Sequence, residues 1–221
     1  GAAPALTALE RPVQPHPFVP DDEAELGARA HEILSIQATG LARRLRSVPG
    51  SGRHRLVLGL SGGLDSTLAL VVGLDALERL GEAPERLLSV TMPGPATSER
   101  TLRTAHALAR ASGTELLEIP IGPAVRQHLA DLGHPEDRHD VTFENAQARE
   151  RTQLLFNLAN QRGAIVLGTG DLSELALGWC TFNADHMASY NVNAGLPKTL
   201  VLYVIRWYAR HRAGPELAEA L

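Results

Sequence analysis

A continuous apolar run that leads directly into a Ser-Gly-Gly-Leu-Asp-Ser turn, within residues 56–67, most constrains how this chain can fold. The apolar run at 56–60 predicts a strand covered on both faces, as in parallel sheets. Gly62 and Gly63 permit a tight turn in which backbone amides can approach an anion closely. From Leu64 onward apolar residues recur at helical spacing, so the turn leads into a helix N-terminus, where free amides and the helix dipole favour phosphate.

The polar side chains of this turn indicate a nucleotide bound with a metal ion. Ser61, Ser66 and Thr67 add hydroxyl donors beside the predicted phosphate site. A polyphosphate repels the Asp65 carboxylate unless a cation lies between them, so Asp65 indicates Mg²⁺. The turn lacks the Gly-Lys-Ser/Thr of a Walker A loop. It resembles the PP-loop of the N-type ATP pyrophosphatases, which split ATP between the α and β phosphates to adenylate a substrate.

The rest of the chain alternates between strand-like and helical segments. Apolar runs predict strands at 55–60, 86–91, 115–119 and 164–168, and helical spacing predicts helices at 23–47, 64–80, 98–112, 143–162 and 199–210. This alternation predicts an α/β fold, a three-layer doubly wound parallel sheet. Ligands of such sheets bind outside the carboxyl ends of the strands, so segments 61–67, 91–98 and 169–174 should meet at one edge.

Bulk properties restrict the class of protein. A chain of 221 residues supports one substantial domain, and a net charge of −4 with no basic run gives no indication of nucleic acid as a partner. We expect no membrane span and no secretory signal, and therefore a cytoplasmic location. Cys180 is the one cysteine, which excludes an internal disulfide, and we expect it to be buried or to line a pocket.

The start of the chain is rich in proline. Five prolines within residues 1–22 favour an extended linker, which we expect to be the end of a connection from a missing upstream domain, with the domain itself at 23–221.

His128, His134 and His139 stand among acidic residues, but their spacing fits no compact metal-ligand pattern.

Polar residues near the other strand ends have two interpretations each. Met92 follows the second strand, where either an adenine pocket or a plain turn fits. Glu174 is either a first-turn helix residue or a second Mg²⁺ ligand opposite Asp65, and we favour the metal role. Asp171, the nearest carboxylate, receives no role.

The helix at 143–162 and the loops after the fourth strand carry further candidates. Asn145, Arg149 and Thr152 share one helix face, while Arg151 is expected to point elsewhere. Aromatic and amide side chains in loops 179–185 and 191–199 indicate a heterocycle-binding surface, or else packing beneath a helix.

Several segments together resemble the synthetase domain of NAD⁺ synthetase over about residues 10–210. They are the turn at 61–66, Met-Pro-Gly at 92–94, Glu-Asn-Ala-Gln-Ala-Arg at 144–149, Gly-Thr-Gly-Asp-Leu-Ser-Glu at 168–174 and Lys-Thr at 198–199. Trp-Cys-Thr-Phe at 179–182 and the proline-rich start resemble the glutamine-dependent bacterial form.

This resemblance implies a carbon–nitrogen ligase that converts deamido-NAD to NAD⁺. ATP adenylates the nicotinate carboxylate with release of pyrophosphate, and ammonia then displaces AMP; in the full-length enzyme glutamine supplies the ammonia. The implied ATP site comprises Gly59, Leu60, Ser61, Gly62, Gly63, Leu64, Asp65, Ser66, Met92, Thr169 and Lys198. The implied deamido-NAD site comprises Asn145, Arg149, Glu174, Trp179, Cys180, Thr181, Phe182 and Asp185. The implied Mg²⁺ ligands are Asp65 and Glu174.

The chain also departs from that family. The glutamine-dependent form carries a glutaminase domain with a Glu-Lys-Cys triad, whereas Cys180 lies inside the synthetase motif, so we expect this chain to lack the glutaminase and to be truncated after Leu221. Family members associate through this domain. Apolar surface on helices 23–47 and 199–210 therefore predicts a homodimer, and a higher oligomer for the full-length enzyme. Two alternatives remain, the synthetase domain of GMP synthetase and a catalytically silent ATP-binding or scaffold domain.

Overall fold

A single parallel sheet organises the protein. The computed structural model describes residues 11, 13–14, 16, 18–20, 22–48, 52–95, 97–135 and 137–221, so most of the expected linker at 1–22 lies outside the described residues. The strands are β1 (Leu56–Gly59), β2 (Leu87–Thr91), β3 (Glu115–Glu118), β4 (Ile165–Gly168) and β5 (Tyr190–Asn191). Their order is β3-β2-β1-β4-β5 and every pairing is parallel, which confirms the predicted doubly wound sheet.

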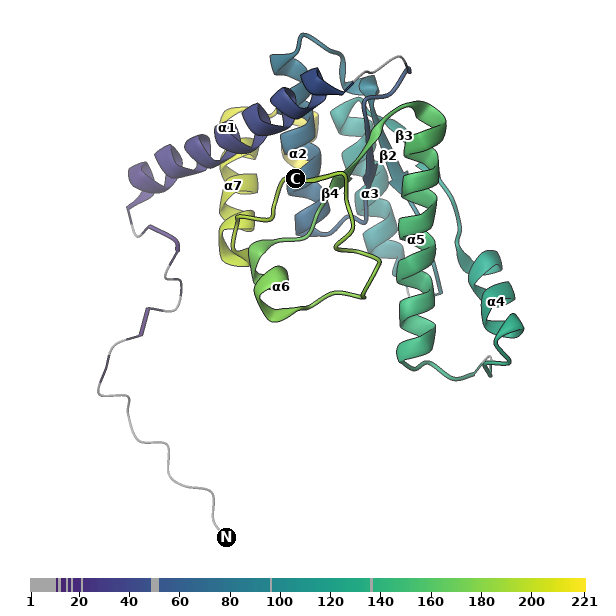
Figure 1. Cartoon of the computed structure of the whole chain (residues 1–221). Coiled ribbons are helices and arrows are strands. Elements are labelled where there is room, and N and C mark those ends of the chain that lie inside the picture. Colours follow the sequence, from purple (N-terminus) through teal and green to yellow (C-terminus); the bar gives the residue numbers. More distant parts are fainter. Residues whose placement is uncertain are drawn as a thin grey trace.

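Helices cover both faces of the sheet (Figure 1). One face carries α1 (Glu23–Ser47), α2 (Leu64–Arg79), α3 (Glu99–Ser112), α7 (Lys198–His211) and α8 (Pro215–Ala220). The other carries α4 (Gly122–Asp131) and α5 (Val141–Arg162), and the short α6 (Leu172–Leu177) follows β4. None of the described helices has the length and apolarity that crossing a membrane requires.

Burial on both faces explains the unbroken apolar strands. Successive side chains of a strand point to opposite faces. Leu56 and Leu58 accordingly pack in the cluster with α1, α2 and α7, whereas Val57 packs in the cluster with α4 and α5. Because neither face meets water, β1 tolerates no polar alternation.

The predicted strands and helices agree with the structure to within two residues at each boundary. Four elements, β5, α4, α8 and the 3₁₀ helix η1 (Pro84–Arg86), were not predicted from the sequence, and only the first turn of α6 was. These elements are short, and β5 is a two-residue strand at the edge of the sheet that pairs with β4 alone. A hydrophobic repeat can be recognised in a sequence only over more residues than such short elements contain.

Among the large apolar side chains of α1 and α7, only Ile36 is exposed, so the expectation that these helices expose surplus apolar surface is wrong. The two helices pack against each other and against α2, which buries Leu34, Leu41, Val201 and Ile205. Exposed large apolar side chains gather instead on α6 and the loop that follows it: Leu172, Leu175, Leu177, Trp179, Phe182 and Met187. This group of exposed apolar side chains lies beside the site described next.

Candidate functional site

A cavity of about 550 Å³ opens at the carboxyl ends of β1, β2 and β4. The chain order of the sheet reverses between β1 and β4, which is where doubly wound sheets bind their ligands. Segments 61–66 and 169–174 leave the two strands side by side at this point, as the sequence predicts. The predicted residues that line the cavity are Gly59, Leu60, Ser61, Asp65, Ser66, Met92, Thr169, Glu174 and Asp185.

The glycine-rich turn lies tightly against α3. Gly62 has φ +81°, and a Cβ built on it would lie 2.5 Å from the carbonyl oxygen of Thr101. The hydroxyls of Ser61 and Ser66 lie 3.0 Å apart, and no described side chain caps the start of α2 at Gly63. The first-turn amides of α2 are therefore available to an anion.

We expect Gly62→Ala to destabilise the fold more than Gly81→Ala does. Both glycines have positive φ, which costs an alanine about 1–2 kcal/mol, but a Cβ on Gly81 meets none of the described atoms within 4 Å. Gly62→Ala additionally forces the turn away from the α3 backbone. Urea denaturation of both variants measures the difference, and equal losses would contradict the close approach.

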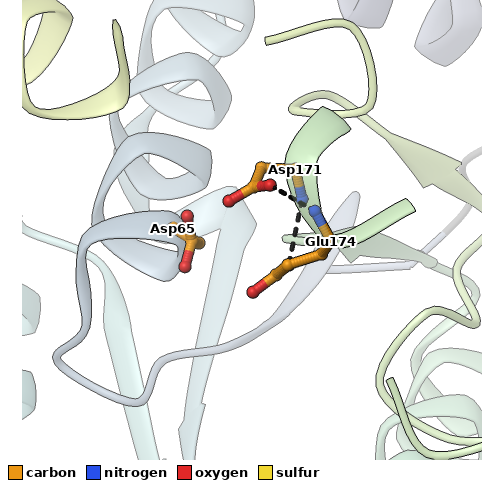
Figure 2. Close-up of side chains that lie close together, drawn as sticks. All are labelled: Asp65, Asp171 and Glu174. Carbon is orange, nitrogen blue, oxygen red and sulfur yellow. Dashed lines mark hydrogen bonds between the residues drawn. The ribbon is translucent and has the colours of Figure 1, made fainter. Parts of the chain in front are cut away.

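Three carboxylates converge beside this turn (Figure 2). Asp65, Asp171 and Glu174 each offer an oxygen within 4.8 Å of the others. Asp171 caps α6, because its Oδ1 accepts a hydrogen bond from the Glu174 N–H (2.8 Å) while Glu174 Oε2 accepts one from the Asp171 N–H (3.1 Å). This capping box holds both carboxylates at the same helix end, opposite Asp65.

The ammonium of Lys198 lies among the three carboxylates. Its Nζ is 2.5 Å from Asp65 Oδ2, 3.1 Å from Asp171 Oδ2 and 3.2 Å from Glu174 Oε1. Burial raises the pKa of Asp65 although Lys198 acts to lower it. Burial would lower the pKa of Lys198, but its hydrogen bonds to Asp65 and Asp171 outweigh that effect and raise the pKa. The cluster thus favours a cation at its centre.

The donor set fits Mg²⁺. Asp65 Oδ1 is buried and accepts no hydrogen bond from the described residues, and the buried Asp171 Oδ2 contacts only the Lys198 ammonium among them, at 3.1 Å. Mg²⁺ prefers carboxylate oxygens, and both of these oxygens are suitable ligands. Asp171 received no role from the sequence, whereas the structure places it in the cluster. The Asp-x-x-Glu spacing of a capping box was the signal that could have found it.

The residues predicted for deamido-NAD divide between two places. Glu174 and Asp185 line the main cavity, whereas Asn145 and Arg149 line a separate hollow of about 350 Å³ between α4 and α5. The loop at 179–185 links the two. Thr181 Oγ1 donates to Asn145 Oδ1 (2.8 Å), Arg149 Nε donates to the Phe182 carbonyl (3.2 Å), and Asp185 Oδ1 accepts from the Thr181 N–H (2.8 Å).

The tips of this loop face outward. Trp179 and Phe182 are 76% and 80% exposed. Cys180 is exposed as well, so the expectation that it is buried is wrong. These exposed aromatic side chains are accessible to a ligand or a partner chain.

Arg151 was predicted to point away from the site, but it lines the main cavity. Its Nε donates to the Met92 carbonyl (3.1 Å), and burial lowers its pKa. The face of α5 toward the cavity holds Ala148, Arg151, Thr152 and Leu155. Thr152, which was predicted to share a face with Asn145 and Arg149, lies with Arg151 on the main cavity, so that grouping is wrong. Helical spacing gives the angle between side chains, but only the packing of α5 on the sheet determines which of them meet the cavity.

Asn193 joins the two halves of the site. Its side chain is fully buried, and Nδ2 donates to the backbone carbonyls of Asp65 (3.0 Å) and Thr169 (3.1 Å). One amide group thereby ties the phosphate turn to the segment after β4. The sequence indicates only a polar loop here, because nothing in it distinguishes Asn193 from Asn191.

The comparisons with known proteins agree with this geometry. The family model described as NAD synthase matches residues 41–216. The glutamine-dependent NAD(+) synthetase of Mycobacterium tuberculosis is 50% identical over 204 residues, which cover 90% of this chain and 30% of that protein. The corresponding protein of Thermotoga maritima is 36% identical over 185 residues, which cover 83% of this chain and 31% of that protein.

A solved structure gives the same result. The glutamine-dependent NAD+ synthetase from Acinetobacter baumannii, in complex with ADP, superposes with a TM-score of 0.75 at 30% identity, covering 86% of this chain and 35% of that one. The chain spans about a third of the length of the curated relatives it matches, at 30–31% of each. Because the family model covers most of its length, this chain belongs to the NAD synthase family.

Proposed function

We propose that this chain catalyses the ATP-dependent amidation of deamido-NAD to NAD⁺, with ammonia as the nitrogen donor. The observation that carries the proposal is the cluster of Asp65, Asp171 and Glu174 beside an uncapped helix N-terminus, at the reversal point of the sheet. That arrangement suits a polyphosphate with its metal ion. The likeness to glutamine-dependent NAD(+) synthetases supports deamido-NAD as the second substrate.

The first step makes an acyl-adenylate. A nicotinate carboxylate oxygen attacks the α-phosphorus of ATP, and the bond between that phosphorus and the bridging oxygen breaks to release pyrophosphate. The first-turn amides of α2 and the hydroxyls of Ser61 and Ser66 hold the phosphates. Asp65, Asp171 and Glu174 would hold Mg²⁺, which supplies positive charge to the departing pyrophosphate.

The walls of the cavity orient the nucleotide. Met92 and Leu155 give it an apolar side suited to adenine, and Arg151 fixes the Met92 carbonyl by hydrogen bonding. Ammonia then attacks the carbonyl carbon of the adenylate, AMP leaves with the carbon–oxygen bond electrons, and the nitrogen loses a proton. The chain needs no nucleophile of its own, because both steps depend on positioning and on charge stabilisation.

Asn145, Arg149 and the loop at 179–185 are the proposed deamido-NAD contacts. Arg149 suits a phosphate of the dinucleotide, and exposed Trp179 and Phe182 suit stacking on its rings. The hydrogen bonds from Thr181 to Asn145 and from Arg149 to Phe182 hold this loop against α5.

One assay tests the proposal. The chain is incubated with ATP, Mg²⁺ and ammonium, with either deamido-NAD or XMP, and AMP and the amidated product are measured. NAD⁺ together with AMP supports the proposal. Amination of XMP favours the GMP synthetase alternative, and nucleotide binding without AMP under either condition favours the silent domain.

We expect glutamine alone to support no synthesis by this 221-residue chain, while ammonium does. A glutaminase triad of the family type needs a cysteine nucleophile, and the one cysteine, Cys180, is exposed in the proposed substrate loop. Release of glutamate from glutamine by the purified chain, measured by coupled assay, would overturn this expectation.

We propose further that two copies of the chain associate through the exposed apolar side chains of α6 and its loop. Light scattering at micromolar concentration should give the mass of a dimer. Leu177 is 81% exposed, and Leu177→Asp should shift the equilibrium to monomer, whereas Ile36→Asp on α1, which is 66% exposed, should not. A monomeric parent chain contradicts the proposal.

A further inference from the structure

Lys198 reaches all three carboxylates of the cluster with one side chain. Nζ contacts Asp65, Asp171 and Glu174 at 2.5, 3.1 and 3.2 Å. Its backbone N–H donates to Ser173 Oγ (3.1 Å), which holds the start of α7 against α6. The side chain is nevertheless 44% exposed, so the ammonium can leave the cluster without unfolding α7.

The single ammonium of Lys198 does not neutralise the negative charge of the three carboxylates. Three carboxylates share a single positive charge. Among the described residues, the buried Asp65 Oδ1 accepts no hydrogen bond, and the buried Asp171 Oδ2 contacts only the Lys198 ammonium. Asp171 is fully buried, so water cannot solvate its charge well. The cluster therefore offers carboxylate oxygens and a net negative charge that suit a divalent ion.

Residue type supports the same interpretation. Lys198 is the one lysine of the chain, and the other 20 residues in the count of lysines and arginines are arginines. A lysine ammonium is a compact point charge with three donors, whereas an arginine presents a planar fork that matches one carboxylate at a time. The compact group is the one that can occupy a position normally filled by a metal ion.

We propose that the ammonium of Lys198 occupies the metal position formed by Asp65, Asp171 and Glu174 until a nucleotide binds. Without nucleotide its ammonium occupies the centre of the cluster and excludes a divalent ion, because two cations cannot share that position. A bound polyphosphate offers the ammonium an alternative anionic partner, and the divalent ion then takes its place. Metal binding is thereby coupled to nucleotide binding. This inference rests on the proposed function only in taking ATP and Mg²⁺ as the ligands.

Direct metal binding tests the inference without any turnover. Mn²⁺ is titrated into the chain in the absence of nucleotide, and the free ion is followed by its paramagnetic resonance signal. Lys198→Met should bind Mn²⁺ at least tenfold more tightly than the parent chain. Arg29→Met removes the same charge from an exposed position on α1 and should leave the affinity unchanged. Adding Asp171→Asn to Lys198→Met should remove most of the gain if Asp171 is a ligand.

The inference is overturned if Lys198→Met binds Mn²⁺ no more tightly than the parent chain, or if Arg29→Met gains as much. A second measurement uses the unaltered chain and covers the case in which Lys198→Met does not fold. With ¹⁵N-lysine labelling, Lys198 gives a single side-chain ammonium resonance. Mg²⁺ alone should leave that resonance unchanged, and Mg²⁺ with a non-hydrolysable ATP analogue should shift it.

A resonance that shifts with Mg²⁺ alone, or stays unchanged with the analogue present, contradicts the exchange. Neither measurement contains deamido-NAD or ammonia. Failure of the proposed function would therefore appear as absent NAD⁺ synthesis with the metal exchange intact, and failure of the inference as synthesis without the exchange.

Discussion

Asp65→Asn and Glu174→Gln should each lower the rate of AMP formation by about two to three orders of magnitude, or roughly 3–4 kcal/mol of transition-state stabilisation. Each change keeps the size of the side chain but removes the charge that would hold Mg²⁺ at the pyrophosphate. The fold should survive, because Asp65 and Glu174 are partly exposed and the amide oxygen that Glu174→Gln introduces can still accept the Asp171 N–H. Rates with ATP, deamido-NAD and ammonium measure the effect.

The position of Asp171 in the structure makes Asp171→Asn unsuitable as the control for this prediction. From sequence, Asp171→Asn is the natural control, since that carboxylate has no assigned role. The structure buries Asp171 within the cluster, so Asp171→Asn should also impair the reaction even though its amide oxygen can still cap α6. Glu32→Gln, an exposed position on α1, is the better control and should leave the rate unaltered. Full activity of Glu174→Gln would show that this carboxylate does not serve the metal.

Asn193→Asp should be the most destabilising isosteric change near the site. The substitution places a carboxylate oxygen against the carbonyl oxygens of Asp65 and Thr169 in a fully buried position. Both carbonyls lose their donor, and a buried charge without a partner costs about 3–5 kcal/mol. Urea denaturation at neutral pH measures the lost free energy of unfolding.

The matched control is Asn157→Asp, the same chemical change at an exposed position of α5, which should alter stability by no more than about 0.5 kcal/mol. If the two variants have equal stability, Asn193 does not join the phosphate turn to the segment after β4. Nucleotide affinity should fall in parallel with stability in Asn193→Asp alone, because the two segments that it connects form opposite sides of the cavity.

Local patterns in the sequence were sufficient to predict the main elements and the phosphate turn. Strands covered on both faces have to be apolar throughout, and a strand followed by two glycines and a helix leaves few alternatives at residues 56–67. Because the predicted sheet is parallel, Asp65, Met92 and Thr169, which follow different strands, were expected at the same edge. Those predictions depend on neighbouring residues or on a general rule of sheet topology, so they needed no coordinates.

Tertiary structure decided what depends on the rotation of helices and on contacts between distant segments. The phase of α5 brought Arg151 into the cavity and turned Asn145 and Arg149 toward a second hollow. The packing of α7 against α1 and α2, together with the hydrogen bond from the Lys198 N–H to Ser173, brought Lys198 to carboxylates 133 and 24 residues away along the chain. Helical periodicity gives the angles between side chains but not which of them meet the cavity, as the separation of Thr152 from Asn145 and Arg149 shows. Separation along the sequence gives no distance between residues that only the fold brings together.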